Sequence, residues 1–450
     1  MVQHNSLLTA SIGPQLARMA GPMALGIVAI QAFNLVDLFF IGLLGTDALA
    51  AISFTFPVTF VVISLAMGLG AGLSASLGQA LGAGNQQQAA QFTSHSLLLA
   101  LALVCLLAGA GATTIDPLFR LLGADDALLV PIHDYMLIWY LTMPLLVLPM
   151  VGNAAIRATG DTRTPSLVMI VAGLVNGLLD PLLIFGVGPF PELGIRGAAI
   201  ASACSWLMAT IVGLWLLRYR KRLLAWPLLR SELLLSHWRQ LLQVAIPASF
   251  TNLLTPLSTA VLMIILAGLG KEVVAAYGAA SRLEALMLIV MMALSSVLAP
   301  FISQNTGAGL HQRSRLALLL SMRFALGFQL LVFGLLWWLA PWLARQFSDN
   351  AEVSRHLTFY LRLVPLGYGL QGCFMLLASA LNGLRVSSIS LLLNGIRLFG
   401  LLLPLAWLGA RWAGEAGIFT GILVANLLAG IIAGAFAWRR FPWKINHPLA

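Results

Sequence analysis

Residues 79–84 read Gln-Ala-Leu-Gly-Ala-Gly, and residues 304–309 read Gln-Asn-Thr-Gly-Ala-Gly. The two stretches are 225 residues apart, half the length of the 450-residue chain. The same offset aligns residues 44–47 (Leu-Gly-Thr-Asp) with residues 269–272 (Leu-Gly-Lys-Glu), and Pro22 with Pro247. One short match is easily chance, but three in one register indicate an internal duplication.

The composition is that of an integral membrane protein. The chain is 60% hydrophobic and 9% charged, with a mean hydropathy of +0.94, whereas soluble domains are about 25% charged. Hydropathy resolves it into about twelve spans of roughly 20 residues, the length that a bilayer requires. We therefore expect an all-α membrane protein in which lipid solvates the apolar surface.

Six spans in each half give both halves the same orientation, as in transporters built from parallel repeats. We expect two pseudo-symmetric six-helix bundles, an N-terminal lobe of residues 1–225 and a C-terminal lobe of residues 226–450. A basic cytoplasmic linker, residues 218–239, joins them.

Charge is distributed by the positive-inside rule. With both termini in the cytoplasm, most Lys and Arg residues fall in cytoplasmic segments, while the opposite loops hold most of the acids. A net charge of +10 could suggest a nucleic-acid partner, but this distribution instead indicates the orientation of a multi-pass protein of the inner (plasma) membrane. Three cysteines and seven histidines show neither a disulfide framework nor metal-ligand spacing.

Four further motifs occur in the first half. They are residues 34–37 (Asn-Leu-Val-Asp), 157–165 (Arg-Ala-Thr-Gly-Asp-Thr-Arg-Thr-Pro), 176–181 (Asn-Gly-Leu-Leu-Asp-Pro) and 197–202 (Gly-Ala-Ala-Ile-Ala-Ser). With the duplicated motif, their order and spacing resemble the multidrug and toxic compound extrusion (MATE) family along essentially the whole chain. The chain looks like the branch of the DNA-damage-inducible F proteins and archaeal members, whose coupling acids lie in the N-terminal lobe.

That resemblance implies a V-shaped twelve-helix fold and a secondary active antiporter. Such a protein would export cationic or amphipathic organic compounds by alternating access, in exchange for protons. It would work as a monomer, with no cofactor besides the coupling ion. A lipid-linked oligosaccharide flippase is an alternative, although the spans that would need several Arg offer few. Neither a catalytic constellation nor a Walker motif appears, so we expect no enzyme.

Three carboxylates lie well inside spans: Asp37, Asp180 and Glu284. A charge at membrane depth is costly, so each predicts a function. The positions opposite Asp37 and Asp180 in the second half are leucines. Asp180 precedes Pro181, so it could instead cap a helix that restarts there, but Asn176 lies one helical turn before it on the same face.

Two acids in one apolar lobe would favour the protonated form of each other, since burial and like charge act in the same direction. Proton and cargo could then compete for one site. The resemblance adds Asn176, Ser202 (where the family usually has Thr), Asn153 and Tyr135 to this coupling site. The oxygens of Asp37, Asn176, Asp180 and Ser202 could hold Na⁺ instead, and the sequence leaves that open while favouring H⁺.

Adaptable apolar side chains with a few polar groups suit varied organic cargo. In these spans they predict cargo contacts at Gln31, Phe33, Asn34, Met67, Tyr140, Met143 and Glu284. Each apolar one also suits ordinary packing. Glu284 either pairs with Arg397, another deep charge, or meets a cationic cargo.

Overall fold

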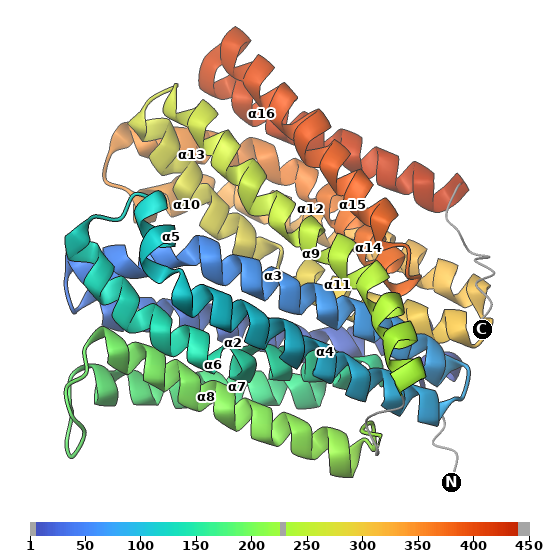
Figure 1. Ribbon diagram of the computed structural model, residues 1–450. Helices are drawn as coiled ribbons and strands as arrows, with labels where there is room; N and C mark the ends of the chain where they lie inside the picture. The colour runs from blue at the N-terminus through green and yellow to red at the C-terminus, as the bar shows by residue number, and fades with distance from the viewer. Residues whose placement is uncertain (1–5, 226–230, 440–450) are drawn as a thin grey trace. The chain divides into compact units, whose positions relative to one another are not determined.

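The computed structural model describes residues 6–225 and 231–439, which form helices and connecting loops without a strand (Figure 1). Eleven helical stretches of these residues are long and apolar enough to cross a membrane. The last, Ser387–Arg439, has 53 residues, too many for one span, and its backbone leaves helical geometry at Ala413 and Gly414. It therefore holds two spans, which gives the expected twelve.

The chain divides into two compact units. The N-terminal unit contains residues 21–249, and the C-terminal unit contains residues from 250 onward together with the start of the chain up to residue 20. The units follow the halves of the sequence except at the first helix of each half, whose beginning belongs to the other unit. Of the expected linker, residues 226–230 lie outside the described residues.

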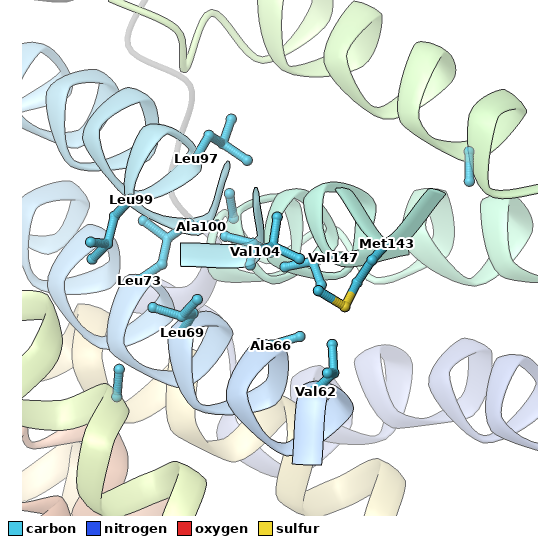
Figure 2. Close-up of a cluster of buried hydrophobic side chains, with 14 of the residues drawn as sticks. Val62, Ala66, Leu69, Leu73, Leu97, Leu99, Ala100, Val104, Met143 and Val147 are labelled. Atoms are coloured by element: carbon cyan, nitrogen blue, oxygen red, sulfur yellow. The ribbon is translucent and has the colours of Figure 1, made fainter. Parts of the chain in front are cut away.

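The core of the N-terminal unit lies where three helices meet. Figure 2 shows side chains of α3, α4 and α6 converging there, among them Leu69, Val104 and Val147. The helices of this unit are α2 (Ile12–Gly42, from residue 21), α3 (Thr46–Gly82), α4 (Gln86–Thr113), α5 (Ile115–Leu121), α6 (Asp126–Ala158), α7 (Arg163–Ile184), α8 (Ile195–Trp215), the π-helical turn η1 (Leu216–Arg220) and the start of α9 (Ser231–Ala267).

The start of α9 packs tightly on α3. A Cβ atom added at Gly72 would lie 2.8 Å from the carbonyl oxygen of Leu241. Only glycine allows two helix backbones to come this close.

The C-terminal unit is built from the remaining helices, and the start of the chain packs into it. Asn305 donates a hydrogen bond of 3.2 Å to the carbonyl of Leu7, and Arg313 donates to the carbonyls of Leu7 and Ala10. Its elements are α1 (Ser6–Thr9), α10 (Lys271–Met287), α11 (Ile289–Gly307), α12 (His311–Phe347), α13 (Ala351–Leu363), η2 (Val364–Gly367), α14 (Tyr368–Gly383), α15 (Ser387–Gly395), η3 (Ile396–Leu402) and α16 (Leu403–Arg439), with the rest of α9.

The duplication is visible in the backbone. Turns at equivalent positions adopt the left-handed conformation, which glycine enters at little cost. Three pairs of positions 225 residues apart share it: Gly45 and Gly270 (φ 114° and 122°), Gly84 and Gly309 (77° and 76°), and Gly160 and Arg385 (89° and 64°). The repeat predicted from the sequence is therefore a structural one.

Candidate functional site

Asp37 on α2 and Asp180 on α7 come together within the N-terminal unit. Asp180 is fully buried, Asp37 is partly buried, and their carboxyl groups hydrogen-bond to one another. Two carboxyls can form such a bond only when one of them holds a proton. Oδ1 of Asp37 and Oδ2 of Asp180 are buried and receive no hydrogen bond from any other described side chain.

Asn176 links this pair to α8. Its amide nitrogen donates to Oδ1 of Asp180 over 3.2 Å and to the hydroxyl oxygen of Ser202 over 3.3 Å. Helix α7 runs without interruption from Arg163 to Ile184, so Asp180 lies near the end of a continuous helix. The alternative that Asp180 caps a restarting helix is therefore wrong.

Glycine on α7 makes room for α2. A Cβ atom added at Gly173 would lie 1.9 Å from Cδ2 of Phe33, whereas one at Gly177 would lie 3.7 Å from Cδ1 of the same ring. The Phe33 ring thus packs directly over Gly173. Phe33 itself lies on α2, one helical turn before Asp37. Phe33, which we predicted to contact cargo, fixes how closely the two acid-bearing helices approach.

Of the other predicted coupling residues, Tyr135 lies near both acids. It is partly buried on α6, within electrostatic range of Asp37 and Asp180. Asn153, on the same helix, is buried, but within the described part of the chain no hydrogen bond joins it to either acid. The structure thus brings Tyr135 to the site and does not connect Asn153 to it.

The predicted cargo residues of this unit divide into two groups. Tyr140 and Met143 belong to the hydrophobic core, where Met143 packs beside Val147 (Figure 2). Met67 on α3 and Asn34 on α2 are exposed, and Gln31 is partly buried. Only this second group is accessible to a ligand in the present conformation.

Glu284 lies in the C-terminal unit, in a separate polar network. Tyr360 donates to its Oε2 and Gln371 to its Oε1, each over 3.0 Å, and Asn426 donates to Gln371 over 3.2 Å. The predicted ion pair with Arg397 is absent among the described residues, although the two groups interact electrostatically. The sequence analysis did not single out Gln371 and Asn426, although amides inside apolar spans are a signal for such sites.

The 157–165 motif connects the turn after α6 to the residue that follows η1. The carboxylate of Asp161 accepts hydrogen bonds from the backbone N–H and hydroxyl of Thr164 and forms a 2.7 Å ion pair with Lys221. Partial burial raises the pKa of Asp161, but Lys221 and Thr164 outweigh burial and bring that pKa below its ordinary value. This motif is therefore a structural link at the start of α7, at the other end of that helix from Asp180.

No group of three His, Cys, Asp or Glu suited to a metal occurs in the residues that the structure describes. The site thus offers two carboxyls, one amide and one hydroxyl, which suit a proton or a hard monovalent cation.

Comparisons with known proteins agree with this architecture. The MatE family model matches residues 22–182 and again residues 247–408, one match in each half. The chain is 47% identical to the "FAD transporter" of Shewanella oneidensis over 98% of this chain and 97% of the relative. It is 23% identical to the multidrug export protein MepA of Staphylococcus saprophyticus, over 92% and 90%. A crystal structure of the Vibrio cholerae MATE transporter VcmN in the bent form aligns with a TM-score of 0.90 and 33% identity, over 96% and 97%.

Proposed function

This chain belongs to the MATE family, whose members are secondary transporters and not enzymes, and on that premise we propose that it exports flavin adenine dinucleotide (FAD) in exchange for protons. It is a multi-pass membrane protein, and we place it in the plasma membrane with both termini in the cytoplasm, as the loop charges favour. The observation that carries the proposed coupling is the hydrogen-bonded pair Asp37–Asp180.

An acid pair of this kind can exchange a proton in a way that responds to cargo. In the state with one proton, the pair carries one negative charge and satisfies part of its own hydrogen bonding. Loss of that proton leaves two like charges in a poorly solvated site, which is unfavourable unless something else compensates. An anionic cargo cannot supply that compensation, so proton and cargo are linked through the conformation of the protein, and such linkage works equally in both directions.

Protons fit this site better than Na⁺. The amide of Asn176 presents its N–H group, and not its carbonyl oxygen, to both Asp180 and Ser202. A sodium site would call for oxygen atoms converging on one point. We therefore keep Na⁺ as the alternative coupling ion, to be separated by experiment.

The cargo is proposed from the relative named FAD transporter, whose similarity extends over nearly the whole of both chains at 47% identity. FAD is an anionic amphipathic compound with two aromatic ring systems, unlike the cations that the family resemblance suggested. Multidrug export is the second candidate, because a relative of that name also matches most of the chain, at 23% identity.

Proteoliposomes containing the purified protein test both parts. We expect a pH gradient to drive FAD flux, followed by flavin fluorescence, and Asp37→Asn to abolish it. Thr59→Ala serves as the control, since Thr59 is a helix residue of the same unit bonded only to its own helix. Undiminished flux in Asp37→Asn would refute the coupling site, and flux driven only by a Na⁺ gradient would replace H⁺ by Na⁺. Transport of an organic cation such as ethidium without transport of FAD would favour multidrug export.

A further inference from the structure

Arg397 is a partly buried charge in the C-terminal unit that forms neither a hydrogen bond nor an ion pair among the described residues. It belongs to η3, a π-helical segment between α15 and α16, and its Nε atom is buried without a hydrogen-bond partner among the described residues. Its guanidinium carbon lies 5.2 Å from the centre of the Phe374 ring. A cation inside an apolar span that has no ion-pair partner is unfavourable, and this favours the binding of an anion there.

Glu284, the acid that interacts electrostatically with Arg397, is hydrogen-bonded to other residues. Both carboxylate oxygens of Glu284 accept hydrogen bonds from neutral donors, Tyr360 and Gln371, and Gln371 is itself held by Asn426. Three different helices thus hold Glu284 in place. Arg397 therefore interacts electrostatically with the Glu284 carboxylate without forming an ion pair with it.

The Arg397 side chain is only partly buried, although its Nε atom is enclosed. Phe374 contacts the guanidinium group, whose five N–H donors lie along its edge in a fixed fork. That fork matches the oxygens of a phosphate, and guanidinium–phosphate contacts are bidentate. π-Helical segments are rare and occur frequently at functional sites.

This site has no counterpart in the first half of the chain. The positions 225 residues before Arg397 and Glu284 are Ala172 and Thr59. Ala172 lies in the α-helix α7, whereas Arg397 lies in a π-helical segment. At this position of the repeat, the charge and the π-helical backbone therefore occur in the second half and not in the first, whereas the acid pair belongs to the first.

We infer that Arg397 binds the phosphate of the cargo, so that the C-terminal unit recognises a phosphate ester carrying an aromatic ring system. This inference rests on the proposed FAD transport, in which the pyrophosphate is the only strongly anionic group. The N-terminal unit then exchanges the proton, and the C-terminal unit distinguishes phosphorylated from unphosphorylated flavins.

The test is binding of FAD, FMN and riboflavin to the full-length protein in nanodiscs, measured by flavin fluorescence, because riboflavin lacks phosphate. We expect Arg397→Gln to weaken FAD and FMN binding by about tenfold or more, the effect of losing charge-assisted hydrogen bonds. Riboflavin binding should stay unchanged, and Arg397→Lys should restore part of the loss. Arg411→Gln is the matched control, since Arg411 is an exposed arginine 5.0 Å from the Trp407 ring in the same unit.

The thermal unfolding midpoint of the ligand-free protein distinguishes a role of Arg397 in ligand binding from a role in folding. Because Arg397 has no hydrogen-bond or ion-pair partner among the described residues, Arg397→Gln should leave that midpoint unchanged or raise it, whereas a purely structural arginine would lower it. Equal FAD affinity in Arg397→Gln and wild type would overturn the inference while leaving FAD transport intact.

A second ligand keeps the two proposals distinguishable. If the wild type binds no flavin, the proposed cargo is wrong, and inorganic pyrophosphate then tests the site by thermal shift. If pyrophosphate stabilises the wild type but not Arg397→Gln, the result would support a phosphate site for another cargo. No stabilisation of the wild type by pyrophosphate would overturn the inference as well.

Discussion

Gly173→Ala tests whether the packing of α2 on α7 sets the acid pair. The added Cβ atom would lie 1.9 Å from Cδ2 of Phe33, whereas ordinary van der Waals contact begins at 3.4 Å. The ring, or the helix that carries it, must therefore move by about 1.5 Å. Overpacking of this kind typically costs about 1–3 kcal/mol.

Such a displacement matters because Asp37 follows Phe33 by one helical turn on the same face. A hydrogen bond is lost when its atoms separate by more than a few tenths of an ångström beyond the usual range. We expect Gly173→Ala to lower the thermal unfolding midpoint and to reduce pH-gradient-driven FAD flux by about tenfold or more, the result of losing one charge-assisted contact.

Gly177→Ala is the matched control. It lies one turn further along α7, and its Cβ atom would make an ordinary contact of 3.7 Å with Phe33. Alanine is the better helix former by about 0.5–1 kcal/mol, so this variant should be at least as stable as the wild type and should transport normally. Wild-type stability and flux in Gly173→Ala would refute the proposed role of this contact. Recovery in the double variant Gly173→Ala/Phe33→Ala would support it.

Three further predictions concern stability. Gly160→Ala should destabilise the protein by about 1–2 kcal/mol in denaturant titrations, because φ at residue 160 is 89° and left-handed backbone is strained with a side chain; an unchanged midpoint would contradict this. Gly72→Ala should cost about 1–3 kcal/mol, since the new Cβ would lie 2.8 Å from the Leu241 carbonyl oxygen, and a neutral effect would show that α3 and α9 are not in close contact. The Asp161–Lys221 ion pair, whose carboxyl has a lowered pKa, contributes stability above the unfolded pKa of about 4. Lys221→Met should therefore have a lower unfolding midpoint than the wild type at neutral pH, and the difference should shrink as the pH falls below about 4. A difference that does not depend on pH would show that the ion pair is not its cause.

The sequence predicted the helical architecture and the acid pair because both leave strong local signals. Apolar runs report spans directly, and Asp37 and Asp180 are conspicuous as carboxylates at membrane depth. The spacing of Asn176 and Asp180 predicted that the two share a helix face, and the structure adds a hydrogen bond between them. These features depend on helix geometry and solvation, which act over a few residues.

Contacts between residues far apart in the sequence could not be predicted in the same way. In a membrane helix nearly every position is apolar, so hydropathy does not tell which face of α6 packs inward, and Tyr140 and Met143 proved to be core residues. Glu284 and Arg397 were candidates for a pair because charge suggests attraction. In the structure Glu284 instead accepts hydrogen bonds from Tyr360 and Gln371. These partners depend on how α10, α13 and α14 pack together.

The exchange of first helices between the two units has a consequence for biosynthesis. The N-terminal unit includes residues 231–249, and the C-terminal unit includes the start of the chain. Neither unit can therefore be completed by translation of its own half of the gene, and a chain cut between residues 225 and 226 would yield two incomplete fragments. Leu7 leaves the ribosome 298 residues before Asn305, which donates a hydrogen bond to its carbonyl. The earliest part of the protein to be synthesised thus reaches its final packing only after most of the membrane spans have been inserted.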